Sequence, residues 1–141
     1  GGSASGVVAA MTAKTMYPEK TITVLRKEEK VMIPCGIPYI YGTVGSSEKN
    51  IMPDDGLIKA GVDILVDEVV KVDPEAKSCQ LKSGEALTYE KLIMGTGSTP
   101  AVPGWLKGTD LENVYTIPKN KVYLDQIQEL VSRTIFRNPG T

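Results

Sequence analysis

The sequence predicts an α/β domain that combines a parallel sheet with a small β-meander. The first observation behind this prediction is the order of patterns along the chain: a glycine-rich start is followed by helical, extended and again helical periodicity. The second is a series of short β-rich runs between residues 62 and 88, separated by clusters of turn-forming residues. The third is the length of 141 residues, which suits one domain.

The first half of the chain is expected to alternate helix and strand. A helix should follow Gly1–Gly6 and end before the first proline, because proline is tolerated once a helix has stopped. Alternating apolar residues predict a strand over Thr21–Leu25, followed by a solvated charged connector over 26–30. A short helix is expected over about 53–61, with proline at its start and glycine at its stop. The apolar face of the first helix should contain Val7, Val8, Met11 and Thr15.

The second half is expected to hold the meander, one further strand and a last helix. A buried strand is predicted over Lys91–Met94, leading into the glycine-rich loop 95–100. The last helix should cover about Lys121–Arg133, and its apolar stripe should contain Tyr123, Ile127, Leu130 and Val131. Residues 134–141 are interpreted as a tail whose Asn-Pro-Gly-Thr end marks a stop. The strands of the meander region are predicted at 62–66, 69–72, 78–81 and 86–88.

Composition excludes several classes of function. Sixteen basic and 17 acidic residues give a net charge of −1, which argues against a nucleic-acid partner. No apolar run approaches the roughly 20 residues of a membrane span, and no signal peptide is visible. The chain has no histidine, and Cys35 and Cys79 lie far apart, so no metal site is expected. These two cysteines are expected to be free thiols in a reducing, cytoplasmic environment.

The first six residues match the pattern G-x-G-x-x-G, with Ser3 in the place of the second glycine. Glycines in this pattern let backbone N–H groups approach a pyrophosphate at the start of a helix. A flexible or cloning-derived glycine start is the alternative interpretation. The acidic residue expected about 20 positions later, for the ribose hydroxyls, is absent. The strand ends instead in Leu25-Arg26, which leaves Arg26 and Lys27 as candidates to contact the nucleotide by another route.

Cys35 is the candidate reactive residue. It lies between Pro34 and Gly36 in a constrained apolar loop, and Pro38-Tyr39 would suit the start of a helix. A helix N-terminus favours the thiolate form of a nearby cysteine. The alternative interpretation is a small buried hydrophobic residue, and that interpretation is preferred for Cys79.

Taken together, three segments resemble the flavin domain of the pyridine nucleotide–disulfide oxidoreductases. They are Gly1–Gly6, the run Pro34–Tyr39 and the run Leu92–Pro100, in which Gly95 replaces an alanine of the family pattern. The run Asn113–Thr116 is also similar to the stretch before the second nucleotide domain of the family. The branch that looks most similar contains NADH oxidases, NADH peroxidases and coenzyme A-disulfide reductases. The resemblance implies a partial Rossmann-like FAD-binding domain over residues 1–133.

The resemblance implies FAD as cofactor and Cys35 as the redox thiol beside the flavin ring. Because position 40 is Ile40, a second cysteine five residues later is ruled out. A single cysteine would then cycle through a sulfenic acid or a mixed disulfide with a small thiol such as coenzyme A. The acceptor could be a disulfide, sulfur, a peroxide or oxygen. The implied cofactor contacts are Gly1, Gly2, Ser3, Gly6, Pro34, Val69, Thr96 and Gly97, beside the candidates Arg26 and Lys27.

Complete members of the family are expected to be about three times as long. The first strand, the NAD(P)H domain, the returning flavin segment and the dimerisation domain are missing from this sequence by comparison. NAD(P)H as reductant and a homodimer are therefore expected of a full-length parent, and the isolated chain is expected to lack a hydride-donor site. Two alternatives remain: a non-catalytic nucleotide-binding or interaction module, and a module that handles small thiols or persulfides through Cys35 alone.

Overall fold

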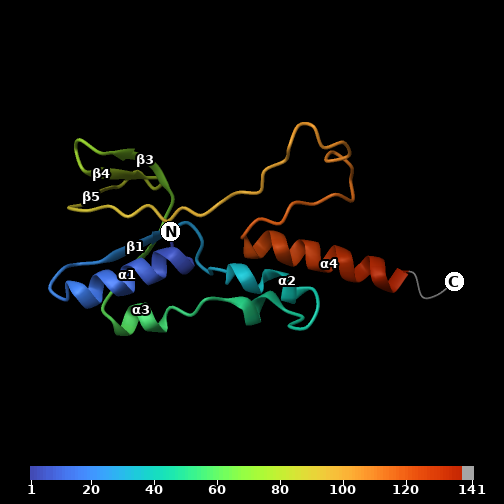
Figure 1. Ribbon diagram of the computed structural model, residues 1–141, viewed down its shortest axis with the longest axis horizontal. Coiled ribbons are helices and arrows are strands. Elements are labelled where there is room, and N and C mark those ends of the chain that lie inside the picture. Colours follow the sequence, from blue (N-terminus) through green and yellow to red (C-terminus); the bar gives the residue numbers. More distant parts are fainter. Residues whose placement is uncertain (138–141) are drawn as a thin grey trace.

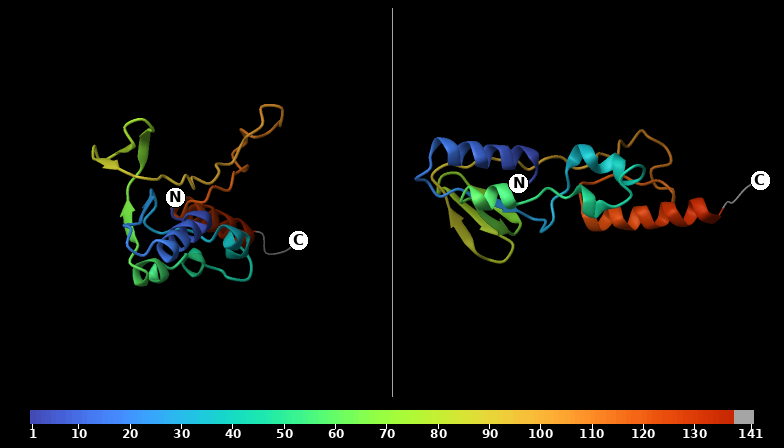
Figure 2. Two further views of the ribbon diagram at one scale, coloured as in Figure 1. Left: turned by 60° about the vertical axis from the view of Figure 1, so that its left-hand side comes forward. Right: turned by 90° about the horizontal axis from the view of Figure 1, so that it is seen from below.

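The structure is a computed structural model that describes the backbone of residues 1–137 and the side chains of residues 1–133. The molecule is elongated, and its elements gather at two ends (Figure 1). One end holds α1, α3, the strands β1 and β2 and the meander, and the other holds α2 and α4 (Figure 2). The mixed composition of helices and strands confirms the predicted α/β class.

The first end is built on a two-stranded parallel sheet. Strand β1 (Thr23–Arg26) pairs with β2 (Asp63–Val66), and Arg26 lies opposite Val66 at the carboxyl edge. Helix α1 (Ala4–Met16) precedes β1, and helix α3 (Asp55–Lys59) precedes β2. The helices bury apolar side chains against the sheet, and the buried cluster consists of Ala10, Val24, Leu57 and Val62.

The meander follows β2 directly. Strands β3 (Val69–Asp73), β4 (Ser78–Leu81) and β5 (Ala86–Thr88) form an antiparallel sheet in the order β3-β4-β5. The predicted meander is confirmed for these three strands, because each pairs with its sequence neighbour through a short turn. The run 62–66, which was predicted with them, is instead strand β2 of the parallel sheet. Gly84 has φ +97 in the turn between β4 and β5, a conformation that favours glycine.

The second end carries the cysteine segment and the last helix. The 3-10 turn η1 (Pro34–Gly36) runs into α2 (Ile37–Ile40), and a second 3-10 turn, η2 (Ser47–Asn50), follows. Helix α4 (Lys121–Arg137) packs on these elements. The buried cluster at this end consists of Met32, Ile37, Ile40 and Leu124.

Polar contacts fix α4 against this segment. Asn120 caps the helix, because its Oδ1 accepts from the backbone N–H of Tyr123 at 2.9 Å. The Tyr41 hydroxyl donates to the carbonyl of Leu124 at 3.2 Å. Lys121 lies between Glu48, at 2.9 Å, and Asp125, at 2.6 Å. The last helix therefore supports the region around the cysteine.

The predicted strand at Lys91–Met94 is wrong. The structure gives these residues no strand, and all four are exposed. A strand needs a neighbour to accept its backbone hydrogen bonds, and in the described part of the chain neither β1 nor β2 pairs with this run. An apolar run without a partner strand therefore remains an extended, solvent-exposed segment.

The apolar faces of the two long helices are partly corrected. On α1 the buried residue is Ala10, whereas Val8 is exposed. On α4 the most buried residue is Leu124, which lies beside the predicted Tyr123 and Ile127, whereas the predicted Leu130 and Val131 are exposed. The helix extends to Arg137, four residues past the predicted end. The predicted stop at 138–141 lies outside the described residues.

Candidate functional site

The glycine-rich start folds tightly on itself. The carbonyl of Gly1 lies so close to Gly6 that any Cβ on Gly6 would overlap it. A Cβ on Gly1 would in turn overlap the carbonyl of Gly95. Only residues without side chains allow this approach of three backbones at the start of α1. This close packing favours the interpretation as a structural glycine loop over that of a glycine start without a structural role.

The segment around Thr96 lies beside the glycine loop, although no strand precedes it. An ideal Cβ on Gly95 would lie 3.5 Å from the backbone nitrogen of Gly6, and one on Gly1 would lie 3.7 Å from the α-carbon of Thr96. Gly97 turns the chain with φ +74. Gly1, Gly6 and Thr96 are thus brought together as the sequence suggested, and their contact with a cofactor remains a prediction.

Arg26 occupies the place where the sequence pattern would put an acid. Its side chain is 7% exposed, and its Cδ would lie 2.6 Å from a Cβ on Gly2. The guanidinium pairs with Asp54 at 2.6 and 2.7 Å and also donates to the carbonyl of Glu29 at 2.7 Å. Hydrogen bonding by Arg26 holds the pKa of the Asp54 carboxyl below its usual value. Arg26 is thus fixed beneath the glycine loop.

Lys27 and Val69 lie at the carboxyl edge of the parallel strands. The N–H of Asp67 donates to the carbonyl of Arg26 at 2.9 Å, which brings the two strand ends together. Lys27 Nζ lies 3.8 Å from Glu68 Oε1, and Val69 follows Glu68 at the start of β3. Ligands of open α/β sheets bind at this edge.

Two buried polar atoms near the glycine loop have no hydrogen-bond partner in the described part of the chain. They are Ser3 Oγ and Arg26 Nε. Both can donate a hydrogen bond, and burial without a partner is costly. Ser3 is the N-cap of the 13-residue helix α1, whose first turn contains no acidic residue. This chemistry fits a ligand rich in hydrogen-bond acceptors, such as a dinucleotide pyrophosphate.

Cys35 is exposed and free, whereas Cys79 in β4 is 2% exposed. The interpretation as a buried hydrophobic residue therefore fits Cys79 and is wrong for Cys35. Helix α2 begins directly after η1, as Pro38-Tyr39 suggested, but it has only four residues. A single turn adds little dipole, so this helix contributes weakly to any thiolate. Pro34 and Cys35 lie in η1, whereas the glycine loop leads into α1.

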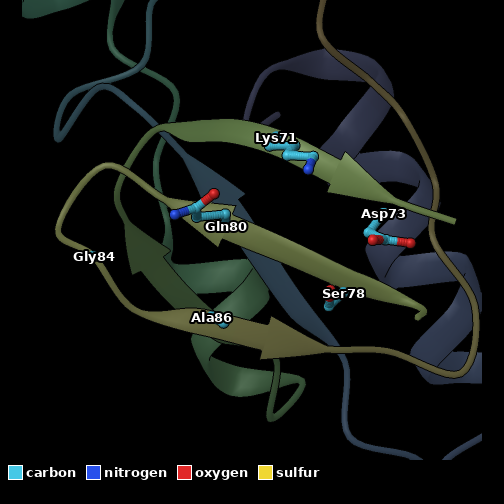
Figure 3. A pocket seen from close by; sticks show the side chains of 6 residues that line it. All are labelled: Lys71, Asp73, Ser78, Gln80, Gly84 and Ala86. Carbon is cyan, nitrogen blue, oxygen red and sulfur yellow. The ribbon is translucent and has the colours of Figure 1, made fainter. Parts of the chain in front are cut away.

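A shallow hollow of about 230 Å³ lies on the solvent face of the meander (Figure 3). It contains none of the sequence-predicted site residues, so we do not assign it to the functional site. Its lining residues are Lys71, Asp73, Ser78, Gln80, Gly84 and Ala86. No helix in the described part of the chain has the length and apolar character needed to cross a membrane. Residues 1–133 contain no cluster of side chains suited to hold a metal ion.

Sequence reasoning missed Asp54 and Asn50. Asp54 precedes α3 and was interpreted only as part of a helix start, although an acid there can reach the end of β1. Asn50 stands in a polar run, and nothing in its sequence context distinguishes it. Both residues act through partners at least 14 positions away: Asp54 through Arg26, and Asn50 through Ile33 and Gly36.

The fold and the glycine loop together define a Rossmann-like α/β protein. Residues 1–133 match the family described as pyridine nucleotide-disulphide oxidoreductase. The chain belongs to this family.

Two relatives of this chain carry the names of oxidoreductases. The chain is 32% identical over 136 residues to the "NAD(P)H sulfur oxidoreductase (CoA-dependent)" of Pyrococcus abyssi, an alignment that covers 92% of this chain and 30% of that protein. It is 28% identical over 120 residues to the "NADH oxidase" of Enterococcus faecalis, covering 78% of this chain and 26% of that protein.

Among solved structures, the reduced CoADR-RHD of Bacillus anthracis superposes with a TM-score of 0.79. It is 26% identical, and the match covers 95% of this chain and 26% of that one. The chain thus spans less than a third of the length of each of these proteins.

Proposed function

We propose that this chain is the FAD-binding portion of an NAD(P)H-dependent oxidoreductase that uses Cys35 as its single redox-active cysteine. The proposal depends mainly on the glycine loop Gly1–Gly6, called the glycine cradle below. In it the buried Ser3 hydroxyl, which has no hydrogen-bond partner in the described part of the chain, lies at the N-terminus of the 13-residue helix α1. Membership of the family and the printed names of the relatives support the reaction class.

The residues that would hold FAD lie around this cradle. Backbone N–H groups at the start of α1 and the Ser3 hydroxyl would donate to the pyrophosphate. Thr96 and Gly97 would lie along the cofactor, Val69 would face the adenine, and Arg26 with Lys27 would border the ribose. A bound flavin would supply two-electron transfer between a nicotinamide and a sulfur substrate.

Cys35 would carry the sulfur chemistry. Its thiolate attacks one sulfur of a disulfide or polysulfide, so that a new S–S bond forms and the other sulfur leaves as a thiolate. Two electrons from NAD(P)H and a proton then cleave the mixed disulfide and restore the cysteine. The exposure of Cys35 supports this role, because an attacking thiolate must be reached in line by its substrate. The name of the Pyrococcus relative favours a small thiol such as coenzyme A as carrier.

We further propose that turnover needs the remainder of a longer protein. Large apolar side chains are exposed along residues 92–117, and Trp105 reaches 81% exposure. Exposed apolar patches of this kind mark surfaces that another part of a protein covers. NAD(P)H would bind in that remainder, and the longer protein is expected to be a cytoplasmic homodimer.

The test is a titration of the purified chain with FAD, followed by absorbance and calorimetry, and a turnover assay of the longer protein. We expect the chain to bind FAD and not to oxidise NADH, because no nicotinamide is held against the flavin. In the longer protein, Cys35→Ser should abolish reduction of disulfide or sulfur acceptors while FAD stays bound. A chain that binds no FAD, or a Cys35→Ser protein with full activity toward every acceptor, would overturn the proposal.

A non-catalytic nucleotide-binding module is the second candidate. The buried Arg26–Asp54 pair favours it, because Arg26 stands where a ribose-binding acid is expected. This candidate predicts that adenosine diphosphate binds as tightly as FAD and that the longer protein shows no Cys35-dependent turnover.

A further inference from the structure

We propose that Asn50 is a positioning residue for Cys35, holding the turn η1 from both of its ends. Asn50 is the last residue of η2 and is 5% exposed. Its amide Nδ2 donates to the carbonyl of Ile33 at 3.0 Å, and its backbone carbonyl accepts from the N–H of Ile33 at 2.9 Å. Ile33 is the residue that leads into Pro34 and Cys35. The entrance of the turn is thus bound twice to one residue.

The exit of the turn rests on the same side chain. Asn50 Oδ1 lies so close to Gly36 that a Cβ on Gly36 would overlap it. The N–H of Gly36 also donates to the carbonyl of Ile33 at 3.0 Å, which closes the turn on itself. The amide of Asn50 therefore touches the residue before Pro34-Cys35 and the residue after it.

Asn50 is itself fixed. The N–H of Met52 donates to the carbonyl of Val31 at 2.8 Å, and Met32 pairs with Ile51 in an antiparallel bridge. The segment 50–52 thus lies along 31–33 as a short ladder. Burying an amide without a hydrogen-bond partner costs free energy. Here the amide Nδ2 of Asn50 donates to Ile33, the residue before η1, which we call the cysteine turn.

This arrangement fixes the backbone of Cys35 while leaving its side chain exposed. Nucleophilic attack on a disulfide is sensitive to geometry, and a displacement of about 1 Å can cost roughly 100-fold in rate. The inference rests on the proposed role of Cys35 as the redox thiol. It adds that the outward orientation of this thiol depends on Asn50.

The test compares three variants of the chain. Asn50→Leu keeps the approximate size of the side chain and removes both polar contacts. Asn50→Asp keeps the shape and the oxygen near Gly36 but removes the donor to Ile33. Ser47→Ala is the matched control, because Ser47 is also buried in η2 but bonds to Asp125 of α4 and not to the cysteine turn.

The measurement is the rate at which Cys35 exchanges with coenzyme A disulfide between pH 6 and pH 10, resolved from Cys79 by peptide mass. On the high-pH plateau, where ionisation no longer limits the rate, Asn50→Leu should be at least about 10-fold slower than the unaltered chain. The plateau rate of Asn50→Asp should lie between those of Asn50→Leu and the unaltered chain. The plateau rate of Ser47→Ala should stay within about twofold of that of the unaltered chain. Cys79 is the internal control, because unfolding would expose this buried thiol and raise its exchange rate. Its exchange should therefore stay slow in every folded variant.

Plateau rates for both Asn50 variants equal to that of Ser47→Ala, with Cys79 still slow, would overturn the inference. The unaltered chain is also titrated with FAD, so that the proposed cofactor site is tested separately from the exchange rate of Cys35. Loss of FAD binding by the unaltered chain would refute the proposed function while leaving the exchange result valid.

Discussion

Arg26 and Asp54 form a bidentate ion pair, with Nη1 to Oδ1 at 2.6 Å and Nη2 to Oδ2 at 2.7 Å. The pair joins the end of β1 to the residue before α3, and the stem of Arg26 lies against Gly2. The side chain of Arg26 is 7% exposed, and a charge buried to this degree destabilises the folded state unless an opposite charge pairs with it. The pair therefore couples the stability of the sheet to the shape of the glycine loop.

We predict that Asp54→Asn lowers the free energy of unfolding by about 2–3 kcal/mol, because it leaves the buried Arg26 without a counter-charge. Urea denaturation followed by circular dichroism measures the change. The control is Glu90→Gln, which breaks the exposed pair of Glu90 with Lys20 and should leave the midpoint unchanged. Equal midpoints for both variants would show that the Arg26–Asp54 pair does not stabilise the fold.

The same pair predicts a pH dependence. Because Arg26 holds the pKa of Asp54 below its ordinary value, the folded state binds its proton less readily than the unfolded state. The stabilisation is fully present above the ordinary carboxyl pKa of about 3.9 and is lost as pH falls through the lower folded value. The stability difference between the unaltered chain and Asp54→Asn should be constant from about pH 5 to 7 and should shrink below about pH 4. A difference that grows with falling pH would contradict this assignment.

Gly6→Ala is predicted to abolish FAD binding, because a methyl group at this position would collide with the carbonyl of Gly1 and push the loop open. Gly56→Ala is the matched control, since Gly56 is also helical and a Cβ there meets nothing within 4 Å. That control should bind FAD normally and gain up to about 1 kcal/mol in stability. Calorimetric titration measures the affinity of both variants for FAD. Similar affinities would mean that the glycine cradle does not bind the cofactor.

Three strands of the meander were predicted almost residue by residue, whereas the run 62–66, predicted with them, pairs in parallel with β1, and no strand forms at 91–94. Strands β4 and β5 needed only their sequence neighbours as partners, so local alternation and turn residues were sufficient. The run 91–94 is equally apolar, but its strand character depends on a partner that local sequence does not reveal. Long-range pairing is the information that local patterns lack.

The candidate site shows the same division. The resemblance placed Thr96 and the glycine loop along the same cofactor, and the structure brings Gly1 and Gly6 close to Gly95 and Thr96. The Arg26–Asp54 pair and the contacts of Asn50 did not follow, since each joins residues that only the tertiary fold brings together. Leu124 was overlooked for a related reason: its burial depends on where α2 packs, and the stripe on α4 alone does not determine it.

The contact of Gly36 with Asn50 gives a last prediction, which concerns energetic coupling. Gly36→Ala alone would force its methyl group into Asn50 Oδ1, and because this amide is bonded to Ile33 it cannot move freely. We expect a loss of about 1–3 kcal/mol in the free energy of unfolding. Asn50→Ala alone should also destabilise the chain by about 1–3 kcal/mol, because the turn loses its hydrogen bond and its packing.

In the double variant the added methyl enters the space that the amide vacated, so the total loss should be smaller than the sum by about 1 kcal/mol or more. Urea denaturation of the four proteins in this cycle measures the coupling. Additive losses would mean that the two residues do not press on each other, and the account of the cysteine turn would then be wrong.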